Sequence, residues 1–193
     1  MTVTFGGGED THSSRAASSL FPHPPLVPPT RYREALGDLT SALKVAPTYL
    51  AARTQRAKLL LMLGRCAEAH GEYEVVLEGE VVAAKAKASK AKPDAPPPKD
   101  TAIVDAQRGV TRAMECAQAH EGARKLADRR DWRGAHELFS KAMEYTEVAP
   151  ELLLERARAS LELGENYDAI ADTGRTLKMS PENIAAFEAR GDI

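Results

Sequence analysis

The sequence has few cysteines, few aromatic residues and no long hydrophobic run. Only two of its 193 residues are cysteines, Cys66 and Cys116, and they lie far apart, with no second cysteine at metal-ligand spacing from either. The pattern predicts neither a disulfide framework nor a zinc site, so both are expected to be small buried side chains. Aromatic residues make up 5% of the chain, which is too little bulky material for a β-sandwich or barrel.

The chain also lacks an excess of charge of either sign. It carries 26 Lys+Arg against 28 Asp+Glu, a formal net charge of -2, so no nucleic acid is expected as a partner. The longest apolar run, Leu59–Leu63, is far shorter than the roughly 18 residues of a membrane-spanning helix, and membrane insertion is not expected. No signal peptide is visible at the start of the chain.

Helix-forming residues dominate what is present, and prolines divide the chain. Ala, Leu, Glu, Lys and Arg favour an all-α fold, whereas the proline clusters around residues 22–29 and 93–98 exclude helix interiors. We therefore predict a disordered Gly/Ser/Pro-rich tail over 1–30 and an Ala/Lys/Pro-rich linker over 79–100, whose first half can continue a helix. The regions 31–78 and 101–193 are predicted to be helical.

A repeat of 34 residues runs through both helical regions. The small and large positions of one helix recur at this offset in each half: Ala35 and Leu39 match Ala69 and Tyr73, and Ala135 and Phe139 match Ala169 and Thr173. Each such helix is expected to pair with the helix before it through small residues that let the backbones approach. The expected crossings are Ala57 with Ala69, Ala123 with Ala135, and Ala157 with Ala169.

Glycines are expected to turn the chain between the helices of a pair, at Gly64 and Gly164. A 34-residue helix–turn–helix unit with these small, aromatic and proline positions resembles the tetratricopeptide repeat. The resemblance implies an α-solenoid truncated at both ends: 31–78 would hold one partial and one full repeat, and 101–193 two full repeats and the start of another. A generic four-helix bundle is the alternative, but it gives no reason for one offset in two places.

The finer sequence is similar to the DnaJ homolog subfamily C member 3 family of co-chaperones, over about residues 31–193. The similarity is carried by residues 35–40, 51–61 and 162–172, and by the long interruption between repeats. It implies a protein of the endoplasmic reticulum lumen that holds unfolded clients on its repeats and works with a seventy-kilodalton chaperone. Because no signal peptide is visible, the cytoplasm is the alternative location, and the His-Pro-Asp triplet of a J domain is absent from these residues.

The first helix of each pair should line the concave face of such a solenoid. Apolar and cationic residues at the inward positions form a candidate peptide groove: Thr54, Lys58, Leu61, Met62, Leu154, Arg158 and Leu161. Arg124, Ala127, Asp128, Glu155 and Glu162 fall at the same positions. The set of Lys, Asn and Arg that grips acidic chaperone tails is missing, and Glu155 would repel such a tail. Whether the apolar members bind a ligand or pack between helices stays open.

No catalytic constellation is found. None of the five histidines lies at a motif spacing from a serine or cysteine nucleophile, and no cofactor or metal motif is present. We therefore expect no enzyme, no cofactor and no metal. The leading hypothesis is a non-catalytic co-chaperone module that binds unfolded or partner polypeptides on its concave face. The alternative is a structural adaptor or scaffold subunit of a larger complex.

Overall fold

The computed structural model describes residues 29–90 and 101–191. These residues form helices and turns, with no strand among them. The helices are α1 (Pro29–Val45), α2 (Leu50–Met62), α3 (Cys66–Ala88), α4 (Thr101–Asp128), α5 (Trp132–Met143), α6 (Pro150–Glu162), α7 (Asn166–Met179) and α8 (Ile184–Gly191). The tail was expected over 1–30; residues 1–28 lie outside the described residues, as does the proline-rich part of the linker, 91–100, whereas residues 29 and 30 belong to α1.

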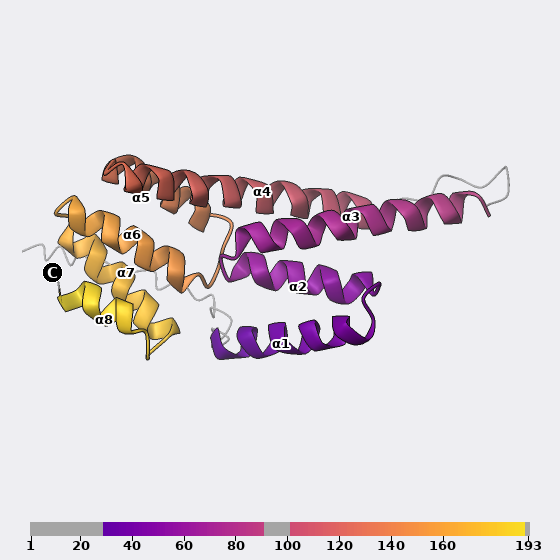
Figure 1. Cartoon of the computed structure of the whole chain (residues 1–193), viewed down its shortest axis with the longest axis horizontal. Coiled ribbons are helices and arrows are strands. Elements are labelled where there is room, and N and C mark those ends of the chain that lie inside the picture. Colours follow the sequence, from indigo (N-terminus) through magenta and orange to yellow (C-terminus); the bar gives the residue numbers. More distant parts are fainter. Residues whose placement is uncertain (1–28, 91–100, 192–193) are drawn as a thin grey trace, which may run out of the picture.

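The helices form an elongated array of antiparallel pairs (Figure 1). We call α2–α3 the first unit, α4–α5 the second and α6–α7 the third; α1 packs on the first unit and α8 on the third. Helices α3 and α4 have 23 and 28 residues, whereas α2, α5, α6 and α7 have 12 to 14. The two long helices run side by side, and the end of α3 reaches beyond the rest of the array (Figure 1).

Each unit turns between its two helices in the same way. Gly64 and Gly164 take left-handed φ angles of 79° and 75°, as expected, and Arg130 takes φ 61° at the equivalent place in the second unit. In the first unit the amide of Gly64 donates to the carbonyl of Leu61 and that of Arg65 to the carbonyl of Leu60. Such bonds close the last helical turn and satisfy carbonyls that a helix end leaves free.

The alanines expected at the helix crossings are all buried. Ala57 and Ala69, Ala123 and Ala135, and Ala157 and Ala169 each have 0% of their surface exposed. Because methyl groups are the largest side chains at these points, the two helices of each unit approach closely. The prediction of tightly paired helices is therefore confirmed for all three units.

An ion pair joins the two helices of the first and third units, and sequence analysis missed it. Arg56 binds Glu72, and Arg156 binds Asp172, at positions that are 100 residues apart in both cases (156 − 56 and 172 − 72). In the second unit the same places hold Gly122 and Leu138, and a Cβ at Gly122 would lie 3.0 Å from the Leu138 side chain. The same crossing is thus polar in the first and third units and apolar in the second.

The prediction that the two cysteines form no disulfide is wrong. They are buried, with 2% and 0% of their surface exposed, but they form a disulfide between the start of α3 and the middle of α4, with 5.6 Å between the Cα atoms. Sequence spacing did not indicate the pair because its members are 50 residues apart and meet only through the packing of α3 on α4. The bond lies inside the main hydrophobic cluster, which runs from α2 to the start of α6.

Candidate functional site

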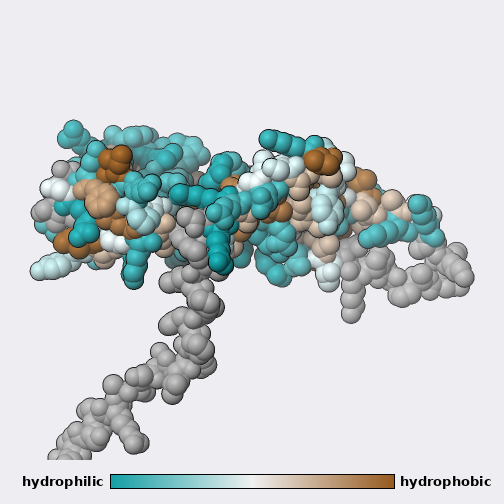
Figure 2. All heavy atoms as spheres, turned by 90° about the horizontal axis from the view of Figure 1, so that it is seen from below, coloured by the Kyte–Doolittle hydropathy of each residue, from teal (hydrophilic) through white to brown (hydrophobic). Residues whose placement is uncertain are grey.

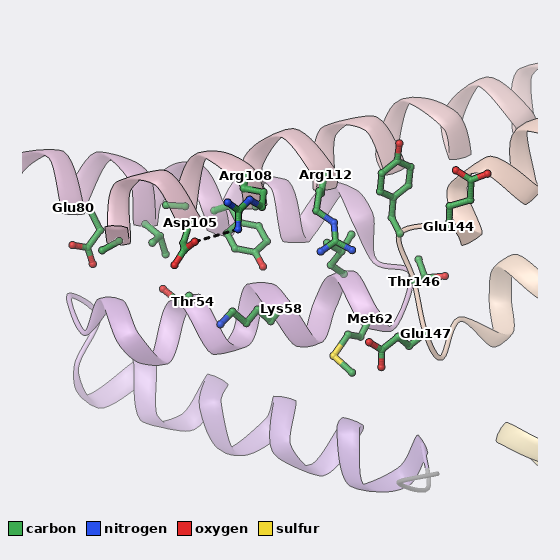
Figure 3. Close-up of a pocket in the computed structure, with 17 residues that line it drawn as sticks. Thr54, Lys58, Met62, Glu80, Asp105, Arg108, Arg112, Glu144, Thr146 and Glu147 are labelled. Carbon is green, nitrogen blue, oxygen red and sulfur yellow. Dashed lines mark hydrogen bonds and ion pairs between the residues drawn. The ribbon is translucent and has the colours of Figure 1, made fainter. Parts of the chain in front are cut away.

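A groove opens between α2 and α4, on the side of the array that the first helices of the units line. Its volume is about 700 Å³. Its walls come from α2 and α4, its floor from α3, and one end from the turn between α5 and α6 (Figure 3). We call it the α2–α4 groove; the lining residues are Thr54, Lys58, Leu61, Met62, Tyr73, Val76, Glu80, Ala102, Asp105, Ala106, Arg108, Gly109, Arg112, Glu144, Tyr145, Thr146 and Glu147.

The length of α3 and α4 creates this groove. In the second unit, the repeat positions that face inward begin near Ala117. Residues 101–116 therefore add about four turns to the start of α4. These extra turns pack on the long α3, while α2 lies on the other side of the gap. The ring of Tyr73 lies on α4 at Gly109, where an added Cβ would come within 2.4 Å of the ring. Glycine at 109 therefore lets a tyrosine form the floor.

Charged residues stand around an apolar floor. Lys58, Arg108 and Arg112 lie in the middle, and Glu80 lies toward one end and Glu147 toward the other (Figure 3). Arg108 pairs with Asp105 at 3.5 Å. Burial raises the pKa of the Tyr73 phenol, and the positive charge of Arg112 opposes that rise. The charge of Arg112 is therefore felt by the phenol in the floor of the groove.

A second cavity, of about 890 Å³, lies between α4 and α6. We call it the α4–α6 cavity; its lining residues are Arg124, Ala127, Asp128, Trp132, Phe139, Glu155, Arg158, Leu161 and Glu162. Glu155 of α6 bridges to α4: one carboxylate oxygen lies 2.6 Å from His120 Nε2, and the other accepts from Arg124 Nε at 2.9 Å. The bridge ties the facing helices of two successive units together.

The Glu155 bridge predicts a pH dependence of stability. Burial alone raises the pKa of the Glu155 carboxyl, but hydrogen bonds from His120 and Arg124 outweigh it and hold that pKa below the ordinary 4.5. The bridge therefore stabilises the fold fully above about pH 4.5, and this contribution disappears as pH falls through the depressed pKa.

We expect Glu155→Gln to lower the free energy of unfolding at pH 7 by about 1 kcal/mol, and the gap to wild type to close below pH 4.5. Urea unfolding across the pH range checks this. Glu151→Gln, an exposed position on the same helix without an ion pair among the described residues, serves as the control. A gap that stays constant down to pH 3 would contradict the assignment.

The residues of the predicted peptide groove fall in three places in the structure: the α2–α4 groove, the α4–α6 cavity and the hydrophobic core. Thr54, Lys58, Leu61 and Met62 lie together in the α2–α4 groove. Arg158 and Leu161 line the α4–α6 cavity, together with five other residues predicted to face inward. Leu154 is 8% exposed and packs against Ala186 and Ala189 of α8. Leu61 also belongs to the main hydrophobic cluster, so it serves both the groove and the core.

Sequence reasoning missed Tyr73 and Arg112 as groove residues. Tyr73 belongs to the second helix of its unit, which was expected to lie outside the concave face. Arg112 comes before the first repeat position of the second unit, and it lines the groove only because α4 begins as early as Thr101. The available signal was that the helical region predicted from residue 101 runs for about twice the length of a repeat helix before the turn of the second unit.

The described residues contain no group of three or more His, Cys, Asp or Glu side chains that could hold a metal ion. None of the helices described combines the length and the hydropathy that crossing a membrane requires.

No protein-family model matches the chain. Its sequence is homologous to DnaJ homolog subfamily C member 3: it is 28% identical to the Rattus norvegicus protein over 155 residues, which are 80% of this chain and 27% of the relative. The Homo sapiens protein is 26% identical over the same shares. The chain therefore spans about a quarter of the length of the curated relatives it matches.

A crystal structure of the P58(IPK) TPR domain matches the fold with a TM-score of 0.67 at 26% identity. The match covers 83% of this chain and 40% of that one. Together with the helix pairs described above, this confirms the expected all-α solenoid of tetratricopeptide repeats, and it supports a protein-interaction module as the general role.

Proposed function

We propose that this chain is a non-catalytic, polypeptide-binding module of a co-chaperone. It holds unfolded or partner protein segments on the concave face of its solenoid, in the α2–α4 groove and the α4–α6 cavity. The groove is the observation that carries the proposal. Its walls and floor combine apolar side chains with charged groups at the rim, and such surfaces accept varied polypeptide segments through apolar contact. Homology to DnaJ homolog subfamily C member 3 supports the same role.

The proposed location is the lumen of the endoplasmic reticulum, with a seventy-kilodalton chaperone as partner system. Both follow from the resemblance to the co-chaperone family. The disulfide between Cys66 and Cys116 supports the location independently of homology, because disulfides persist in oxidising compartments and are rare where glutathione keeps thiols reduced.

A pair of methionine variants tests the binding role. Met62 is half-buried in the α2–α4 groove, whereas Met114 is 38% exposed on α4 outside the lining of the groove. We expect Met62→Lys to weaken binding of reduced, carboxymethylated α-lactalbumin about fivefold, because a charge replaces an apolar contact. Met114→Lys should bind as wild type does. Fluorescence anisotropy gives the affinities, and circular dichroism checks that both variants fold.

Wild-type protein that fails to bind the unfolded client, or equal losses in the two variants, would contradict the proposal. Lysine is chosen for both because its long stem can carry the charge to solvent, which limits the cost to folding.

An adaptor role is the second candidate, and one observation favours it. Large apolar side chains are exposed on α7 and α8: Tyr167 at 90%, Ile170 at 42%, Ile184 at 73% and Phe187 at 56%. Hydrophobic residues gather at the end of the molecule formed by α6–α8 (Figure 2). Clustered exposed apolar groups mark protein contact surfaces. If this end docks on a neighbouring subunit, Phe187→Glu should abolish capture of that subunit and leave α-lactalbumin binding unchanged.

A further inference from the structure

Two cations face each other across the α2–α4 groove. Lys58 extends from α2 and Arg112 from α4, and both point into the space between the helices (Figure 3). Within residues 29–90 and 101–191, neither makes an ion pair, whereas their neighbour Arg108 is paired with Asp105. The two facing walls therefore offer positive charge that the described part of the chain does not neutralise.

An apolar floor lies beside the two cations. It consists chiefly of Tyr73 and Val76, which are 5% and 2% exposed, so they are already held in place by the core. Arg112 is close enough to the Tyr73 phenol to act on its pKa. The apolar lining that a ligand can reach beside the cations therefore comes chiefly from the half-buried Met62 and Tyr145, above Tyr73 and Val76.

Acidic residues limit what the groove can accept. Glu80 lies toward one end and Glu144 and Glu147 lie toward the other (Figure 3). A run of carboxylates along the groove would meet these like charges, which disfavour it. The charge pattern is complementary to a segment with a single acidic residue in its middle and neutral or basic residues on either side.

We propose that the α2–α4 groove binds an extended polypeptide segment through one carboxylate side chain, held between Lys58 and Arg112, and through an apolar side chain two residues away that packs on the apolar lining of the groove. In an extended chain, residues i and i+2 point to the same side, so one segment can make both contacts. A carboxylate accepts charge-assisted hydrogen bonds from a guanidinium and an ammonium group together. This inference rests on the proposed polypeptide binding and names the class of segment.

Fluorescein-labelled nine-residue peptides of Ser, Gly and Lys with a central Leu-Ser-Glu test the inference on the full chain. We expect this peptide to bind about tenfold more tightly than the matched Leu-Ser-Gln peptide, as measured by fluorescence anisotropy. Ala-Ser-Glu should also bind more weakly than Leu-Ser-Glu, and a peptide with Glu-Glu-Glu at the centre should gain nothing over the single acid. The preference for Glu over Gln should shrink at high salt.

Variants of Arg112 test whether this cation makes the contact. Arg112→Glu should remove the preference for Glu over Gln and create one for Leu-Ser-Lys, whereas Arg112→Lys should keep most of the original preference. Arg133→Glu is the control, because Arg133 is exposed on α5, lines neither cavity and makes no ion pair among the described residues.

The outcomes separate this inference from the proposed function. If α-lactalbumin binds and Met62→Lys weakens it, but no peptide prefers Glu over Gln up to about 1 mM, the carboxylate site is wrong and the polypeptide-binding role stands. If α-lactalbumin does not bind at all, the proposed function fails. A Glu preference that survives Arg112→Glu, or a phosphoserine peptide that binds more than tenfold better than Glu, would also overturn the assignment.

Discussion

Replacing Asp172 by Ala is expected to lower the free energy of unfolding by about 3–5 kcal/mol. The Asp172 side chain is 3% exposed and accepts two hydrogen bonds from Arg156, at 2.7 Å from Nε and 2.8 Å from Nη2. Arg156 in turn donates to the Ser140 hydroxyl at 3.0 Å. One guanidinium thus connects α5, α6 and α7, and its side chain is only 18% exposed. Without Asp172 a largely buried positive charge would lose its main partner, which is a far greater cost than losing a surface pair.

Urea unfolding followed by circular dichroism measures this loss, and Asp168→Ala is the matched control. Asp168 is exposed on the same helix, one turn earlier, and makes no ion pair among the described residues. Removing both charges tests the cause: Arg156→Met combined with Asp172→Leu should recover at least half of the loss, because the unpaired charge is gone. Equal effects of Asp172→Ala and Asp168→Ala would contradict the role given to the pair.

Amide hydrogen exchange can locate the effect. In a solenoid each unit contacts mainly its neighbours, so stability is distributed along the array. We expect exchange to quicken most in α6 and α7 of the Asp172→Ala variant, and least in α2 and α3. Uniform acceleration along the whole array would indicate that the units unfold together.

The helices and their crossings could be predicted because their signals are local. The alanines at 57, 69, 123, 135, 157 and 169 share one spacing, and each is fully buried as expected. Gly64 and Gly164 adopt the left-handed turns that glycine permits. The fold class follows from such repeated short-range patterns, which need no knowledge of how distant segments meet.

The groove could be predicted only in part, because it depends on contacts between distant segments. Four residues at the inward positions of α2 line the α2–α4 groove, but the position of α4 relative to α2 was not available from the repeat. Lys58 and Arg124 occupy the same repeat position, yet Arg124 binds Glu155 while Lys58 faces the groove. Leu154 was expected in the groove and packs in the core, since α8 covers it.

The Cys66–Cys116 disulfide leads to the second large expected effect. Reducing it should lower the free energy of unfolding by about 4 kcal/mol, because a cross-link over 50 residues restricts the unfolded chain by that amount in the chain-entropy model. Unreduced protein, denatured in guanidinium, should contain no free thiol by Ellman's reagent. Both sulfur-bearing residues are almost fully buried, so a reductant should reach the bond only when the α3–α4 contact opens, and reduction should be slow under native conditions.

The double variant Cys66→Ala/Cys116→Ala separates the cross-link from its packing. It should be insensitive to reductant and about as stable as reduced wild type, since alanine fits the same tight contact with a smaller side chain. Two thiols in unreduced, denatured wild type, or an equal effect of reductant on the variant, would contradict the cross-link. The result also bears on location: a loss of about 4 kcal/mol is a large part of the 5–15 kcal/mol that stabilises a typical domain. A loss of that size would support the proposed location, because disulfides persist in oxidising compartments and are rare where thiols are kept reduced.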